Sequence, residues 1–286
     1  MDTMPSLTEI FGSYRPYKIT EDTYVISFMN GSQYMYLLEG KEKALLIDTG
    51  WGAGNLRGFV EGLTSKEILV ANTHYHPDHA GSNGEFEEVM MSWGWAMDKA
   101  SVDTPGIGPF DHSTLPYPDY KHSVIGTGSV IDLGGRKIEV FNAKDAHCFS
   151  SLFFFDRENG MFFCGDEFEA GQVNLFDNSL NERSGYDVRK CLANFKDNAL
   201  FIKDFGDQIK YLLPNHNGTP IAMSYLDEFI ELVDAIYAGT ATVEEKLNHP
   251  FLEKDPKAAT LCRVRYKSVS IFINKNQVMT QYGVEA

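Results

Sequence analysis

The sequence contains no run of lysine and arginine residues and no apolar stretch long enough to span a membrane. Among its 286 residues, 25 are Lys or Arg and 40 are Asp or Glu, which gives a formal net charge of −15. An acidic surface repels the phosphate backbone of nucleic acids. We therefore expect neither nucleic acid nor a membrane to be the partner of this protein.

Cysteine is also scarce, and the four cysteines present have no C-x-x-C spacing. This pattern argues against a thiolate zinc site and against a framework of disulfides. The first ten residues lack the basic and apolar regions of a signal peptide. We therefore predict a cytoplasmic protein with reduced thiols, and we leave its oligomeric state open, a homo-oligomer included.

The histidines, by contrast, are concentrated in one short segment. Residues 74–79 read His-Tyr-His-Pro-Asp-His and follow an apolar run at 68–70. Side chains alternate between two faces in an extended segment, so His74 and His76 point the same way and can bind one ion. Asp78 and His79 follow where the chain turns, and they can reach a second ion. Because imidazole and carboxylate groups are the natural ligands of Zn²⁺ and similar divalent ions, the segment predicts a metal site.

Three more candidate ligands each follow an apolar strand pattern, at the point where a loop begins. They are His147, Asp166 and His216. A single histidine after a strand is usually a surface or hydrogen-bonded residue, and a Gly-Asp pair is usually a turn. All three share one placement, however, and they supply ligands that the first segment lacks. We therefore predict that they complete a site for two metal ions.

Other conspicuous residues receive a structural interpretation. The remaining histidines do not follow a strand pattern and are expected to be structural; they are His112, His122 and His249. The segment 83–120 is rich in aromatic residues among Gly and Pro. We expect these aromatics to pack against the core, with an ordered loop over the site as the alternative; they are Trp93, Trp95, Phe110, Tyr117 and Tyr120.

Hydrophobic periodicity places strands early in the chain and mixes strands with helices later. Strands are predicted at 23–28, 34–38, 44–48, 129–133, 137–141, 152–155, 161–164 and 210–213, with a further strand leading into the histidine segment. Helices are predicted at 55–63, 186–205 and 224–238, the last with Ser224 as its cap. This order suggests sheets that are covered by helices on their outer faces.

These motifs together resemble the metallo-β-lactamase superfamily. Its members carry an Asp after an early strand, then H-x-H-x-D-H, a His, an Asp in a Gly-Asp pair and a final His. Here the first Asp is Asp48, and the later positions are those named above, in the same order and spacing. One departure is Ala146-His147-Cys148, where many relatives have Gly-His-Thr or Gly-His-Ser. The resemblance implies an α+β fold, a four-layer αββα sandwich, formed as one domain over residues 1–286.

The resemblance also implies a role for each site residue. His74, His76 and His147 would hold the first metal ion. Asp78, His79 and His216 would hold the second ion, and Asp166 would bridge the two. Asp48 corresponds to an aspartate that orients the ligand loop through hydrogen bonds. Cys148 and Cys164 lie near the site in sequence, and we expect both to be buried as small apolar residues.

The function that follows is a metal-dependent hydrolase. Two divalent ions, expected to be Zn²⁺ with Fe or Mn as alternatives, would lower the pKa of a bridging water and supply hydroxide to a small-molecule ester, thioester or lactone. Asp78 is the expected proton carrier. Asp166 argues against antibiotic hydrolysis, because true β-lactamases usually lack this bridging residue. The residue set resembles hydroxyacylglutathione hydrolases, acyl-homoserine lactonases and tRNA-processing endonucleases, and the acidic charge disfavours the last of these.

The sequence also allows three alternatives to this ester, thioester or lactone hydrolase. A di-iron oxidoreductase of the same superfamily would reduce oxygen or nitric oxide, but such members usually have Glu where His76 stands and are fused to a flavin-binding domain. A phosphodiesterase would use the same two ions, and a binding protein with an idle metal site is the third alternative. A basic cluster for glutathione is not evident, since we expect Arg263, Arg265 and Lys267 to form a solvated strand face.

Overall fold

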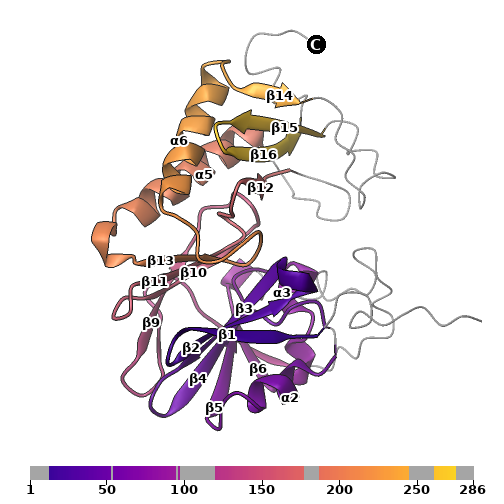
Figure 1. The fold of residues 1–286 in the computed structure, drawn as a ribbon, viewed down its shortest axis with the longest axis vertical. Helices are drawn as coiled ribbons and strands as arrows, with labels where there is room; N and C mark the ends of the chain where they lie inside the picture. Colours follow the sequence, from indigo (N-terminus) through magenta and orange to yellow (C-terminus); the bar gives the residue numbers. More distant parts are fainter. Residues whose placement is uncertain are drawn as a thin grey trace, which may run out of the picture.

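The first sheet of the computed structural model combines antiparallel and parallel strands in the order β1-β2-β3-β4-β5-β6-β7. The structure describes residues 13–52, 54–94, 96, 120–176, 187–244 and 261–274. The strands of this sheet are β1 (Arg15–Thr20), β2 (Thr23–Phe28), β3 (Gln33–Glu39), β4 (Lys43–Ile47), β5 (Glu67–Ala71), β6 (Glu88–Met91) and β7 (Lys121–Val124). From β4 to β7 all neighbours are parallel, so the carboxyl ends of β5 and β6 lie at one edge of the sheet (Figure 1).

The second sheet has the strand order β13-β11-β10-β9-β8. Its strands are β8 (Val130–Asp132), β9 (Lys137–Asn142), β10 (Leu152–Asp156), β11 (Met161–Gly165) and β13 (Tyr211–Pro214). β11 and β13 are parallel neighbours, and their last residues, Gly165 and Pro214, are paired. The loops that follow these two strands therefore begin side by side.

The main core lies between the two sheets. Tyr36 of β3 and Phe163 of β11 meet there edge to face, with ring centroids 5.0 Å apart. α2 (Leu56–Glu61) covers the outer face of the first sheet, and α5 (Val188–Lys203) and α6 (Ser224–Tyr237) cover that of the second. The layers are thus helix, sheet, sheet and helix, which confirms the predicted αββα sandwich (Figure 1).

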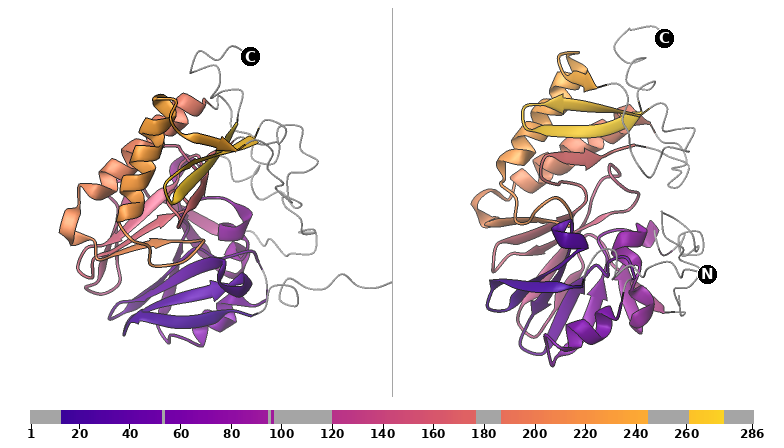
Figure 2. Two further views of the ribbon diagram at one scale, coloured as in Figure 1. Left: turned by 45° about the horizontal axis from the view of Figure 1, so that its top comes forward. Right: turned by 45° about the vertical axis from the view of Figure 1, so that its right-hand side comes forward.

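A third sheet was not predicted from the sequence. It consists of β12 (Gln172–Asn174), β14 (Thr242–Glu244), β15 (Leu261–Tyr266) and β16 (Val269–Asn274). α6 lies beside β15 and β16 in both views of Figure 2, and Val264 and Ile271 join the same core cluster as the helices. On the opposite face Arg265 forms an ion pair with Glu244 at 2.7 Å and its side chain is half exposed, as expected of a solvated strand face. The side chain of Arg263 on the same face is only 24% exposed, and Lys267 lies after the strand.

The predicted helix boundaries need two corrections. Ser224 is the first residue of α6, and the cap position is Met223, whose side chain makes no capping hydrogen bond. α2 is shorter than predicted, and its cap is Asn55, whose side chain accepts a hydrogen bond from the Gly58 amide at 2.8 Å. Within the described ranges, the other short helices are η1 (Met29–Gly31), α3 (Pro77–Ala80), η2 (Asn83–Glu85) and η4 (Gly206–Gln208).

The expectation that the aromatics of segment 83–120 pack against the core is half right for the two described ones. Tyr120 is buried, whereas Trp93 is 63% exposed. Three of these aromatics and two structural histidines lie outside the described residues: Trp95, Phe110, Tyr117, His112 and His249. In the described part of the chain, no helix combines the length and the apolar character that a membrane span requires.

Candidate metal centre

The histidine segment leaves the first sheet at the end of β5 and turns immediately. His76 keeps an extended backbone, and Pro77 then begins the single turn of α3, which carries Asp78 and His79. The amide of His79 donates to the His76 carbonyl at 2.9 Å. Because Pro fixes the first helical φ angle, this turn follows directly from the sequence. Four candidate ligands therefore come from six consecutive residues.

The other three candidates reach the same edge from the second sheet. His147 lies in the loop between β9 and β10, and the amide of Leu152 at the end of that loop donates to the Thr73 carbonyl at 2.7 Å. Asp166 follows β11 and His216 follows β13, the two strands whose ends are paired. The sandwich thus brings all seven predicted residues to one edge, although their role as metal ligands stays a prediction.

The first group comprises three histidines and one carboxylate whose donor atoms lie within 4.8 Å of one another; it consists of His74, His76, His147 and Asp166. His76 Nδ1 lies 3.0 Å from His74 Nε2 and 3.1 Å from His147 Nε2. Asp166 Oδ2 lies 3.7 Å from His147 Nε2 and 3.9 Å from His74 Nε2. Three imidazoles and a carboxylate oxygen at such separations suit one tetrahedral ion.

The second group shares the same aspartate and consists of Asp78, His79, Asp166 and His216. Asp78 Oδ2 lies 3.1 Å from His216 Nε2, which in turn lies 3.3 Å from His79 Nε2. Asp166 Oδ2 lies 3.2 Å from His79 Nε2 and 3.5 Å from His216 Nε2. One oxygen of Asp166 is therefore common to both groups, which is the arrangement a bridging ligand requires.

The donor atoms present fit divalent metal ions. The Oδ1 atom of Asp166 is buried and has no hydrogen-bond partner, and burying an unpaired carboxylate oxygen is costly. A bound cation would compensate this cost. Nitrogen and oxygen donors of this kind suit Zn²⁺, Fe and Mn alike, so the donor set does not by itself choose the metal.

Most of the imidazoles are held by a hydrogen bond on the ring nitrogen that faces away from the group. His147 Nδ1 lies 2.8 Å from the Asn174 carbonyl oxygen, and His216 Nδ1 lies 2.7 Å from that of Ser32. His74 Nδ1 lies 3.0 Å from the Thr73 hydroxyl. Such partners fix ring orientation and raise the basicity of a ligating histidine.

Asp48 is fully buried and makes several of the hydrogen bonds that support the candidate ligands. Its Oδ1 accepts a hydrogen bond from the Thr73 amide at 2.7 Å. Its Oδ2 lies 2.9 Å from His79 Nδ1 and accepts hydrogen bonds from the Thr73 hydroxyl at 2.7 Å and from Asn215 Nδ2 at 2.9 Å. Asp48 therefore connects the histidine segment to the loop of His216 through hydrogen bonds of the predicted kind.

The two groups differ in their electrostatics. Burial lowers the pKa of His76 to about 3, with help from the neighbouring His147, and burial together with His79 lowers the pKa of His74 well below its usual range. In the second group burial also lowers the pKa of each histidine, but nearby carboxylates outweigh it. Carboxylates, Asp166 foremost, raise the pKa of His216 to about 10 and raise that of His79 well above its ordinary value.

Glu169 is a residue of the site that sequence reasoning missed. Its carboxyl is buried and accepts a hydrogen bond from Asn217 Nδ2 at 2.5 Å, and burial followed by the charge of Asp166 raises its pKa to about 8. It thereby connects the loop of Asp166 to that of His216. The only signal in the sequence is its position three residues after Asp166, which does not distinguish it from a surface glutamate.

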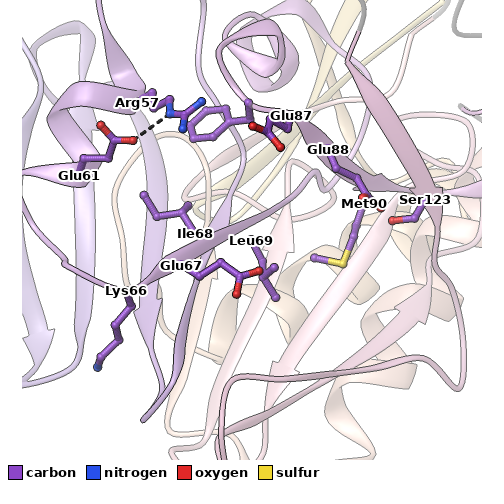
Figure 3. Close-up of a pocket in the computed structure, with 11 residues that line it drawn as sticks. Arg57, Glu61, Lys66, Glu67, Ile68, Leu69, Glu87, Glu88, Met90 and Ser123 are labelled. Carbon is purple, nitrogen blue, oxygen red and sulfur yellow. Dashed lines mark hydrogen bonds and ion pairs between the residues drawn. The ribbon is translucent and has the colours of Figure 1, made fainter.

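The remaining predictions concern residues away from the two groups. His122 lies on β7 and is exposed, in line with a structural role. Cys148 and Cys164 are both buried and neither forms a disulfide, as expected of small apolar residues. A separate pocket of about 490 Å³ opens between α2, β5 and β6 (Figure 3). It includes Glu67 and Ile68 at the amino-terminal end of β5, whereas the histidine segment follows the carboxyl end.

The family model described as the metallo-beta-lactamase superfamily matches residues 29–205, well over half of the sequence. The chain belongs to this superfamily. The matched range includes β3 to β7 of the first sheet and β8 to β11 of the second, together with six of the seven candidate ligands. His216 and the strands β14, β15 and β16 of the third sheet lie beyond it.

Three curated relatives have different activities. An acyl-coenzyme A thioesterase MBLAC2 of Gallus gallus is 27% identical over 164 residues, which are 49% of this chain and 58% of that protein. A hydroxyacylglutathione hydrolase of Rippkaea orientalis is 24% identical over 212 residues, 70% of this chain and 76% of the relative. A coenzyme F420H(2) oxidase of Methanocaldococcus jannaschii is 28% identical over 152 residues, 49% of this chain and 35% of the oxidase.

Solved structures support the fold. A beta-lactamase domain protein from Burkholderia ambifaria superimposes with a TM-score of 0.61 at 17% identity, covering 83% of this chain and 80% of that one. The chain spans less than two thirds of the length of the thioesterase that it matches. The superfamily includes hydrolases and oxidoreductases among these relatives, so the choice between them depends on the site.

Proposed function

We propose that the protein is a binuclear metal-dependent hydrolase that cleaves a small-molecule thioester, ester or lactone. The observation that carries this proposal is the pair of donor groups that share Asp166 Oδ2. His74, His76 and His147 would hold one divalent ion, and Asp78, His79 and His216 the other. We expect Zn²⁺, with Fe or Mn as alternatives. Ions bound there would lower the pKa of water towards neutrality and so supply hydroxide.

The residues of the chain have separate tasks in this reaction. Asp166 would set the spacing of the two ions, and Asp48 would keep His79 and the loop of His216 in place. Burial raises the pKa of the Asp78 carboxyl, but His79 and His216 outweigh burial and lower that pKa well below its ordinary value. Asp78 is therefore ionised at neutral pH, as a metal ligand must be. Its carboxylate would be the proton acceptor for water, although the lowered pKa makes it a weaker base than an ordinary carboxylate. Addition of water to the acyl carbon breaks the bond to sulfur or oxygen and releases an acid and a thiol or alcohol.

A thioester is the first substrate class to test, because a thioesterase and an acylglutathione hydrolase are both among the relatives. The zinc-loaded protein is incubated with thioesters, esters, lactones and phosphodiesters. Asp166→Ala and His76→Ala should each lose most of the metal and lower hydrolysis more than about 100-fold, since even outer partners of metal ligands contribute 10–100-fold. His122→Ala, on the exposed face of β7, is the control. Full activity with both ions retained in either variant contradicts the proposal.

An oxidoreductase is the second candidate, and the coenzyme oxidase among the relatives favours it. Oxygen or nitric oxide reduction would require iron and an external electron donor. His76 speaks against it, because the superfamily members of that kind usually carry Glu at this position. Metal analysis of the protein as purified, followed by oxygen consumption with a reduced donor, separates the two. Iron with rapid oxygen uptake and no hydrolysis would favour the oxidoreductase.

A further inference from the structure

Two large aromatic residues are exposed at the edge that carries the metal centre, one in a helical turn after β6 and one in the loop after β9. Trp93 is 63% exposed and Phe149 is 44% exposed. Most other large apolar side chains in the described ranges are buried. Exposed aromatics that gather beside a reaction centre usually bind something apolar.

Topology places both residues next to the donor groups. β5 and β6 are parallel neighbours, so the histidine segment after β5 and Trp93 after β6 leave the sheet at the same edge. Phe149 lies two residues after His147. Its loop is fixed to the histidine segment by the hydrogen bond from the Leu152 amide to the Thr73 carbonyl, 2.7 Å long.

The helical turn of Trp93 and Gly94 also packs directly on the loop of Phe149. A Cβ atom at Gly94 would lie 2.5 Å from Cε1 of Phe149 and 2.1 Å from Oγ of Ser150. Only glycine can make so close an approach. The amide of Ser150 donates to Asp145 Oδ1 at 3.0 Å, and this hydrogen bond holds the loop of Phe149 in place. The backbone at Gly94, directly after Trp93, therefore packs against the side chains of Phe149 and Ser150.

We propose that Trp93 and Phe149 form an aromatic shelf that binds the apolar acyl chain of the substrate while its carbonyl carbon is at the metal centre. This inference rests on the proposed hydrolase function and names the substrate class. The shelf has neither a charge nor a hydrogen-bond donor apart from the indole N–H. It suits an acyl chain better than the phosphates or carboxylates of a thiol carrier, which require cationic partners.

The test compares acyl thioesters of one thiol carrier with 2, 4, 6 and 8 carbons in the acyl group. Each methylene taken up on an apolar surface contributes about 0.8 kcal/mol, or about fourfold in kcat/KM. The wild-type protein should prefer octanoyl to acetyl at least about tenfold. The double variant Trp93→Ser with Phe149→Ser should lose this ratio, whereas Tyr17→Ser, an exposed tyrosine on β1, should keep it. An unchanged ratio in the double variant overturns the shelf.

Measurements of equilibrium binding show whether the aromatic shelf or the proposed hydrolase function is wrong. Calorimetry measures binding of octanoate and of acetate to the zinc-loaded protein, and circular dichroism confirms that each variant is folded. If no thioester is cleaved but the double variant alone loses its preference for octanoate, the shelf stands and the proposed function falls. If thioesters are cleaved and the preference survives in the double variant, the shelf falls alone. A wild-type protein with neither activity nor a preference for octanoate overturns both.

Discussion

At the scale of single residues, the two donor groups differ in how ready they are for a metal ion. A ligating imidazole must be unprotonated. His74 and His76 have lowered pKa values, so their nitrogens are free at neutral pH. His79 and His216 have raised pKa values and carry protons there, balanced by Asp166 and Asp78. The first group can therefore bind a cation without losing protons, whereas the second group must release protons when it binds one.

This difference predicts ordered, pH-dependent metal uptake. Lowering the pH from 8 to 6 should weaken binding of the second ion by about tenfold per pH unit for each proton displaced, because His216 remains protonated up to about pH 10. Binding of the first ion should change far less, since the pKa of His76 is about 3. Competition with a coloured chelator at pH 6, 7 and 8 measures both affinities. Equal pH dependence of the two steps contradicts this account.

The seven candidate ligands were the part of the site that the sequence predicted best. Each predicted ligand follows an apolar strand pattern, and a strand end is a local feature that one sequence displays. Glu169 and Trp93 could not be interpreted in the same way. The buried contact of Glu169 with Asn217 and the exposure of Trp93 depend on loops that are distant in sequence.

At the scale of elements, Arg136 connects the two main sheets beneath the core. It lies in the turn between β8 and β9 and is buried, and its guanidinium pairs with Asp156 of β10 at 2.7 Å. It also donates to the Thr23 hydroxyl at 2.7 Å and to the Glu39 carbonyl at 3.0 Å, both in the first sheet. One side chain thus satisfies polar groups of β2, β3 and β10.

Removing this guanidinium should be costly. Arg136→Met leaves the buried Asp156 carboxylate without its ion pair, and we expect the free energy of unfolding to fall by about 3–5 kcal/mol. Arg157→Met, which breaks an exposed pair with Glu139, should cost about 1 kcal/mol or less. Urea unfolding at equal metal loading measures both. A loss for Arg136→Met no larger than for Arg157→Met would refute the role of this residue.

Elements with strong local patterns were predictable, and those that depend on remote pairing were not. β10 and β11 are continuous apolar runs, and α6 has a clear apolar stripe. β12 and β14 have only three residues each, and β12 pairs with β16, about 100 residues away in sequence. β1 was missed because its residues are mostly exposed and lack apolar alternation.

At the scale of the whole molecule, the sandwich explains why seven separated side chains can meet. The parallel strands of each sheet end at one edge, and the loops of both sheets are connected there by Asp48, Asn215 and the Leu152 amide. The superfamily match and the αββα layers agree with the predicted fold. That residues 1–286 form one domain, and that the protein is cytoplasmic, stay predictions.

The central claim is that this edge holds two ions, and anomalous diffraction from crystals grown with zinc tests it most directly. We predict two peaks, one among His74, His76 and His147 and the other among Asp78, His79 and His216, with Asp166 between them. A single peak, or donor side chains that point away from each other in the zinc-soaked crystal, would contradict the account.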